Sequence, residues 1–208
     1  MEDLSEQSIR QNCPHCNTHS QAFLYPLKET NNFHIICDGH PLVEGHILII
    51  PKQHLSCVGE YPDYLFKEFI KLNKKVSQFL KKEYGSVSSF EHGIFGQTVF
   101  HSHIHYLPFK GKSVDIVPEN KLSQISDLSE LKILFKKDKG YLFFSLENKL
   151  MSVDTNLTAP RFFRDRFAIA LGREERADWK SMHNNQKLMQ EAQKESESIQ
   201  RKWKLFFR

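Results

Sequence analysis

The spacing of apolar residues along the chain predicts an antiparallel pair of strands followed by a long amphipathic helix. Residues 33–37 and 45–50 are β-prone and apolar, and the segment between them, Asp38-Gly39-His40-Pro41, has the composition of a turn. Over residues 62–84 apolar positions recur every three or four residues, while most lysines fall on the other side. This is the pattern of a helix that packs on a core with one face and meets solvent with the other.

The rest of the chain predicts further strands and helices. We expect two strands over residues 87–90 and 99–107, a hairpin over 141–144 and 149–153, and helices over 160–172 and 183–205. Residues 111–139 carry no pattern that assigns an element. The whole favours an α+β fold, with a long helix packed on an antiparallel sheet of about five strands.

Composition narrows the class of protein. With 208 residues, 39% of them hydrophobic and 26% charged, the chain is long and apolar enough for one domain with an extension, which excludes a wholly disordered protein. No apolar run is long enough to span a bilayer, and the polar, acidic first residues do not form a secretory signal, so a cytoplasmic location is expected.

Charge gives little support for a nucleic-acid partner. The formal net charge of +4 is too weak by itself to indicate one. The basic excess lies in residues 161–208, where either a solvated helix or contact with an anionic partner explains it.

Three histidines, His101, His103 and His105, alternate along the predicted strand 99–107. Alternate side chains of a strand point to the same face, so the three imidazoles would line one side about 6–7 Å apart. One interpretation is the solvated face of an edge strand. The other is a functional site, because imidazole serves as a metal ligand and as a nucleophile near neutral pH.

The residues around these histidines resemble a known family. Gly96-Gln97-Thr98-Val99-Phe100-His101-Ser102-His103-Ile104-His105 resembles the signature of the histidine-triad family of nucleotide hydrolases and transferases. Residues 38–54, DGHPLVEGHILIIPKQH, are similar to its other characteristic block. The resemblance implies a histidine-triad catalytic domain over residues 13–112. Residues 1–12 are expected to form a flexible tail, and residues 113–208 an extension with the predicted hairpin and helices.

The resemblance also implies catalytic roles. His103 takes the position of the nucleophile that attacks the α-phosphorus of a nucleotide and forms a nucleotidyl-histidine intermediate. His105 would contact the phosphate or the leaving oxygen, and Gln97 and Thr98 would donate hydrogen bonds to phosphate oxygens. Family members that transfer the nucleotide to phosphate or a sugar phosphate resemble a pattern ending in glutamine, so His105 favours the hydrolase branch.

Binding residues follow from the same resemblance, with one departure. Asp38 takes the position of the acidic residue that holds the ribose hydroxyls, and Ile36 and Phe33 that of base-pocket walls. Where the family often has an asparagine upstream of Gly-Gln, this chain reads Phe90-Glu91-His92-Gly93. A contact to the substrate is therefore missing or supplied differently; His92 either takes part or is structural.

Cys13 and Cys16 have the spacing of half a metal site or of a redox pair, but the βαβ context that the redox reading requires is absent. Some members of the family that the chain resembles carry a structural Zn²⁺, which implies Cys13, Cys16, His54 and His101 as ligands. The alternative is that the two cysteines are plain buried thiols. We expect His15 and His19 at the surface, and Cys37 and Cys57 in the core.

Residues 160–180 are similar to a tail of some bacterial family members described as dinucleoside polyphosphate hydrolases. Arg161, Arg164 and Arg166 would either pair with a polyphosphate or stay exposed on a packed helix. Because members are usually dimers, residues 183–208 are candidates for packing on a second subunit.

The sequence therefore predicts a hydrolase that acts on dinucleoside polyphosphates or nucleoside phosphoramidates and releases a nucleoside monophosphate. The alternatives are a nucleotidyltransferase with an acceptor other than water, and a nucleotide- or nucleic-acid-binding module with little turnover.

Overall fold

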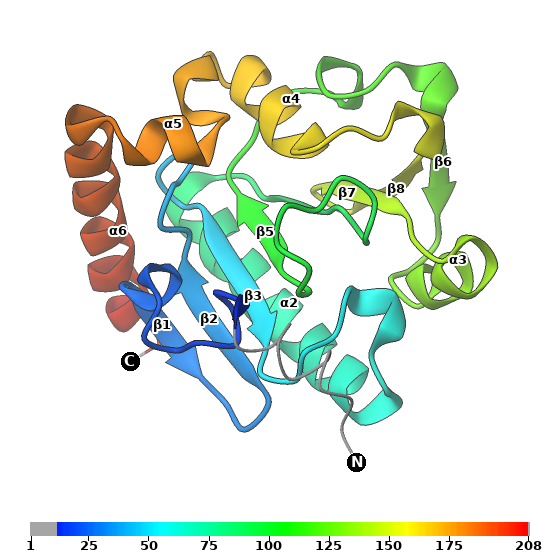
Figure 1. The fold of residues 1–208 in the computed structure, drawn as a ribbon, viewed down its shortest axis with the longest axis horizontal. Coiled ribbons are helices and arrows are strands. Elements are labelled where there is room, and N and C mark those ends of the chain that lie inside the picture. Colours follow the sequence, from blue (N-terminus) through cyan, green and yellow to red (C-terminus); the bar gives the residue numbers. More distant parts are fainter. Residues whose placement is uncertain (1–11, 208) are drawn as a thin grey trace.

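The computed structural model describes residues 12–207, so the predicted tail over residues 1–12 lies outside the described residues except for Asn12. All strands of the described part form one antiparallel sheet, in the order β1-β2-β3-β5-β4-β7-β8-β6 (Figure 1). The strands are β1 (Pro26–Glu29), β2 (Phe33–Cys37), β3 (Ile47–Pro51), β4 (Ser88–Glu91), β5 (Ile104–Leu107), β6 (Leu122–Ile125), β7 (Leu142–Leu146) and β8 (Lys149–Val153).

The α+β class is confirmed, but the sheet of the described residues has eight strands rather than about five. Three of these strands, β6, β7 and β8, come from the C-terminal half of the chain, and β1 was not assigned from the sequence. β4 pairs with β5 on one side and with β7 on the other, where Ser89 lies opposite Tyr106 and Ser145 respectively. The predicted hairpin forms β7 and β8, and β6 comes from the segment that no sequence pattern assigned.

Apart from short 3-10 turns, the helices of the described part are α2 (Asp63–Tyr84), α3 (Glu130–Asp138), α4 (Phe162–Ala170), α5 (Trp179–His183) and α6 (Gln186–Phe206). The long helix α2 matches its prediction closely. It ends at Gly85, whose φ of 78° suits a residue without a Cβ and whose N–H donates to the Lys81 carbonyl. No helix within residues 12–207 is both long and apolar enough to cross a membrane.

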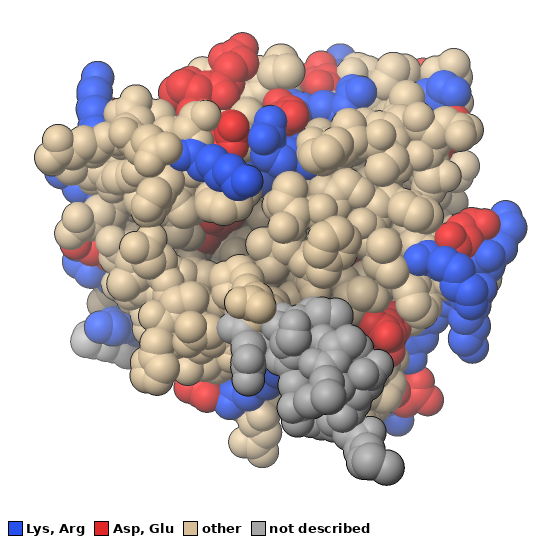
Figure 2. All heavy atoms as spheres, in the orientation of Figure 1, with Lys and Arg blue, Asp and Glu red and all other residues tan. Residues whose placement is uncertain are grey.

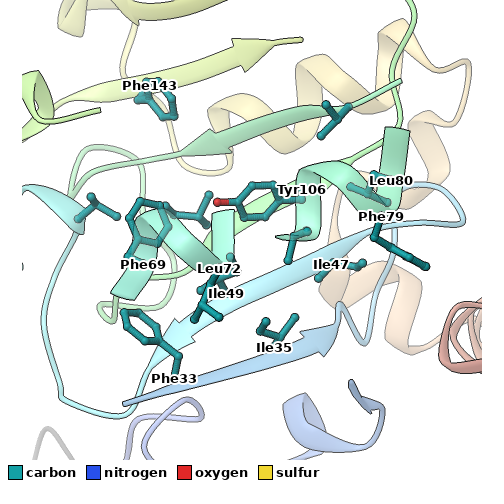
Figure 3. Close-up of a cluster of buried hydrophobic side chains, with 14 of the residues drawn as sticks. Phe33, Ile35, Ile47, Ile49, Phe69, Leu72, Phe79, Leu80, Tyr106 and Phe143 are labelled. Atoms are coloured by element: carbon teal, nitrogen blue, oxygen red, sulfur yellow. The ribbon is translucent and has the colours of Figure 1, made fainter. Parts of the chain in front are cut away.

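Alternation along the strands divides the core between the two faces of the sheet. Phe33 and Ile35 of β2 and Ile49 of β3 point toward α2, where they pack on Phe69 and Leu72 (Figure 3). The core on this side continues into α6, where the Trp203 and Phe79 rings lie 4.9 Å apart.

Helix α4 covers the other face of the sheet. Its side chains Phe163 and Phe167 pack on Phe90 of β4 and Phe144 of β7. Since β4 and β7 come from different halves of the chain, this second core forms only when both halves are folded together.

A buried carboxyl group lies at the end of β4. Glu91 is fully buried and accepts hydrogen bonds from the Val58 N–H and from the hydroxyls of Ser102 and Tyr141. Burial raises the pKa of Glu91 to about 7, because these donors only partly replace the water that the carboxylate loses.

We expect the Glu91→Gln substitution to change how stability depends on pH. A carboxyl group whose pKa is raised on folding stabilises the fold fully below its unfolded pKa of 4.5, and this contribution is lost as pH rises toward 7. The unfolding free energy of the Gln variant minus that of the wild type should therefore rise by roughly 3 kcal/mol across that window. Urea unfolding of both proteins at pH 5, 6, 7 and 8 measures this difference; a difference that stays constant contradicts it.

Candidate active site

The segment that carries the three histidines is irregular before it enters the sheet. β5 begins at Ile104, so the predicted strand 99–107 is too long at its start, and of the three histidines only His105 lies in a strand. Phe100 is 64% exposed. The reason is that Ser102 anchors the segment: its N–H donates to the Leu55 carbonyl, and its hydroxyl donates to Glu91.

His103 lines a cavity of about 280 Å³. Its Nδ1 lies 2.6 Å from the His101 carbonyl oxygen, which can only accept, so Nδ1 carries the proton. The lone pair of Nε2 is then available. Burial lowers the pKa of His103, which keeps the ring neutral near pH 7. A neutral imidazole held in one tautomer beside a cavity has the properties of a nucleophile.

A chain of hydrogen bonds also sets the tautomer of His105. The Leu42 N–H donates to Nδ1 of His46, so the proton of His46 is on Nε2. That Nε2 lies 2.9 Å from Nδ1 of His105, which therefore accepts and leaves the His105 proton on Nε2. The His105 ring stacks on Phe90 with centroids 4.3 Å apart. His105 thus offers an N–H donor at the wall of the cavity, next to the His103 ring at 4.9 Å.

Asp38 lines the same cavity and forms an ion pair that the sequence analysis missed. Its Oδ2 lies 2.9 Å from Nη1 of Arg164, and its Oδ1 accepts from the His40 N–H at 2.8 Å. Burial alone would raise the pKa of Asp38, but His46 and Arg164 hold it well below its usual range. The carboxylate therefore stays ionised, and each of its oxygens already accepts a hydrogen bond from the protein.

Of the other residues predicted to contact the nucleotide, only one lines the cavity. Thr98 lines the cavity. Gln97 does not: its Nε2 donates to the Ser56 carbonyl, and its buried Oε1 has no partner among the described residues. Ile36 and Phe33 point to opposite faces of the sheet and pack in separate apolar clusters, and neither lines the cavity.

Four histidines that were not assigned to the site from the sequence also line the cavity: His15, His40, His92 and His183. His15 is only 7% exposed, which corrects the expectation of a surface residue, and its ring lies 4.8 Å from that of His103. The position of His15 between Cys13 and Cys16 could have indicated this place, because both cysteines lie close to His101 of the triad.

His92 lines the cavity and accepts the Phe163 N–H on Nε2, so it joins α4 to the site. His19 is exposed, as expected, and Cys37 and Cys57 are in the core.

Of the three arginines, Arg161 and Arg164 line the cavity, whereas Arg166 donates to the Ile116 carbonyl and lies over the Phe162 ring. Arg164 is buried rather than exposed on the helix. Figure 2 shows the hollow on this face, with acidic atoms visible inside it and Lys or Arg side chains along its upper rim.

The four predicted metal ligands meet beside the triad. One atom from each of Cys13, Cys16, His54 and His101 lies within 4.8 Å of the others. Sγ of Cys16 is 3.2 Å from Nδ1 of His54, and Sγ of Cys13 is 3.5 Å from Nδ1 of His101. These separations match the edges of a zinc tetrahedron, about 3.5 Å for bonds of about 2.3 and 2.0 Å. His101 donates from Nε2 to the Pro51 carbonyl, which leaves Nδ1 free to bind a metal.

Asp38, His46 and His105 form a second compact group. His46 is already hydrogen-bonded to His105, and the Arg164 cation lies against the Asp38 carboxylate, so this group does not suit a metal ion.

Sequence comparison relates the chain to known proteins. Residues 25–112 match the family model described as the HIT domain. An uncharacterized HIT-like protein of Borreliella burgdorferi is 33% identical over 102 residues, which are 45% of this chain and 73% of that protein. Adenosine 5'-monophosphoramidase HNT1 of Saccharomyces cerevisiae is 28% identical over 93 residues, 45% of this chain and 59% of that one.

Among solved structures, the chain is similar to a HIT family hydrolase from Clostridium thermocellum, with 28% identity, a TM-score of 0.41, and coverage of 50% of this chain and 97% of that one. The match to the family model, residues 25–112, includes Asp38, His54 and the three histidines. The chain belongs to the HIT family.

Proposed function

We propose that the protein is a nucleotide hydrolase that forms a covalent bond between His103 and the α-phosphorus of its substrate. The observation that carries this proposal is the hydrogen bond from His103 Nδ1 to the His101 carbonyl. It fixes the tautomer and leaves Nε2 as a nucleophile at a cavity that also holds Asp38 and His105. Membership of the HIT family supports the same chemistry.

The reaction has two displacements. In the first, the lone pair of His103 Nε2 forms a bond to phosphorus, and the bond from phosphorus to the leaving group breaks with its electron pair on the leaving group. The ring becomes a cation whose Nδ1–H stays hydrogen-bonded to the His101 carbonyl. In the second, water bonds to phosphorus, the electron pair of the P–N bond returns to His103, and the proton of water passes to solvent. The product is a nucleoside monophosphate.

The chemistry of the leaving group determines whether it needs only a hydrogen bond from His105 or also a proton. A polyphosphate leaves as an anion and needs only hydrogen bonds, such as one from the His105 Nε2–H or from Thr98. The nitrogen of a phosphoramidate must gain a proton as it leaves. We propose dinucleoside polyphosphates and nucleoside phosphoramidates as the two substrate classes. A relative of this chain is named a monophosphoramidase, and Arg161 at the cavity wall suits an anionic leaving group.

We further propose that the protein holds one structural Zn²⁺ on Cys13, Cys16, His54 and His101. Two thiolates and two imidazoles complete a tetrahedron, so the metal has no open position for a reactant and acts by fixing the N-terminal segment next to His101. Thiolate ligands suit the reducing cytoplasm that the sequence analysis expects. A homodimer is also part of the proposal.

We expect His103→Ala to lower turnover by about 10⁴-fold or more while AMP still binds, because the substitution removes the atom that bonds to phosphorus and leaves the rest of the cavity. Product release from a diadenosine polyphosphate and from an adenosine phosphoramidate measures turnover. Calorimetry measures AMP binding, and intact mass of the quenched wild type detects the adduct.

His19→Ala is the matched control, since His19 is an exposed histidine outside the cavity. Turnover retained in His103→Ala contradicts the proposal. Product that forms only when an acceptor other than water is added identifies a transferase instead.

We expect Cys13→Ser to lose zinc and to lower the melting temperature by about 5–10 °C, because the binding energy of a structural metal is part of the folding energy. Metal analysis of the purified protein should find about one zinc per wild-type chain and little in the variant. Cys57→Ala is the control, since Cys57 is a buried cysteine away from the four ligands. Wild-type protein without zinc contradicts this proposal.

A further inference from the structure

The residues expected to hold the base do not reach the cavity, and other residues take the place beside Asp38. Ile36 and Phe33 are packed elsewhere, whereas Trp179 and His183 of α5 line the cavity. Both belong to the C-terminal segment, outside the part that matches the HIT domain model. The structure therefore has an aromatic wall that the family model does not describe.

Two arginines of the C-terminal segment hold the turn that follows β2, next to this wall. Nη2 of Arg164 donates to the His40 carbonyl at 2.7 Å, and Nη1 of Arg176 donates to the Pro41 carbonyl at 3.1 Å. Both guanidinium groups are buried. Arg176 is held in turn by Glu195 of α6, so the position of the turn is set by the C-terminal segment.

The aromatic side chains at the turn contact one another. The His40 and Trp179 rings lie 5.8 Å apart, and Nε2 of His40 is 3.2 Å from Nδ1 of His183. Asp178 accepts the Lys180 N–H and thereby caps α5 at the residue before Trp179. The half-buried indole thus contacts the His40 ring and belongs to a helix whose start is capped.

A continuous series of contacts along the cavity joins the nucleophile to this wall. The His103 and His105 rings are 4.9 Å apart, and Nδ1 of His105 is 3.6 Å from the Asp38 carboxylate. Asp38 accepts the His40 N–H, and His40 contacts Trp179. A nucleotide has the same order of parts: a phosphate, a ribose with two hydroxyls and a flat base.

We propose that Trp179, with His40 beside it, forms the subsite that binds the base of the nucleotide joined to His103. The proposal rests on the proposed function, because it places the phosphate at His103 and the ribose at Asp38. An indole face stacks on any base, and the binding energy depends little on which base it is. The subsite therefore selects nucleotides over sugar phosphates and is tolerant of the base.

The chain has two tryptophans, Trp179 and Trp203, which gives a direct optical test. Trp203 lies in the core between α6 and α2, so in a Trp203→Phe background the fluorescence reports Trp179 alone. We expect AMP to quench this fluorescence and ribose 5-phosphate to leave it unchanged. Calorimetry on the chain with both tryptophans gives the same comparison without that substitution.

Trp179→Ala should raise the Kd of AMP and the KM of the substrate by about 5- to 150-fold, with kcat changed little and the Kd of ribose 5-phosphate unchanged. Trp179→Phe should restore most of the affinity, because a phenyl ring also stacks. Tyr64→Ala is the control, since Tyr64 is an exposed aromatic residue of α2 outside the cavity.

The outcomes separate this inference from the function on which it rests. Equal AMP affinity in Trp179→Ala and wild type, or equal affinity of the wild type for AMP and ribose 5-phosphate, overturns the subsite and leaves the hydrolase intact. A wild type that binds no AMP and hydrolyses neither substrate class overturns both.

Discussion

The buried ion pair between Asp38 and Arg164 is the interaction on which the rest of the site depends. Taking a carboxylate out of water is unfavourable unless a cation and hydrogen bonds replace the lost hydration. Here Arg164 provides the cation, and the His40 N–H provides a hydrogen bond. The pair keeps a negative charge next to the neutral rings of His46 and His105, and it joins the turn after β2 to helix α4. Without Arg164 the carboxylate would be buried and uncompensated, and the C-terminal segment would lose its main polar contact with the cavity.

The sequence predicted the parts of the fold that local pattern controls. Helix α2 and the hairpin of β7 and β8 follow from apolar spacing and turn residues over a short stretch of chain. The pairing of β7 with β4 could not be predicted in this way, because about fifty residues separate the two strands and nothing in either strand specifies its neighbour. β6 and α3 were missed because their short, polar segments carry weak periodicity.

The candidate site was predictable where the family resemblance fixes positions and not where tertiary packing decides. His103, His105, Asp38 and the four metal-ligand candidates come together as the resemblance implied. Gln97 does not line the cavity, since its amide is used by the Ser56 carbonyl. Ile36 and Phe33 are absent from the cavity because neighbouring elements cover them on both faces of the sheet. Trp179 and Arg164 could not be assigned from sequence, because their roles depend on α4 and α5 folding back over residues far earlier in the chain.

The position of β4 inside the sheet also limits where the chain can be shortened. A chain that stopped after the segment matching the HIT domain would leave β4 with a row of unpaired backbone N–H and carbonyl groups, and Phe90 would lose its cover from α4. An open strand edge next to uncovered aromatic surface is a template for aggregation. The C-terminal half therefore covers a strand edge and an aromatic surface that the matched segment would otherwise expose to solvent.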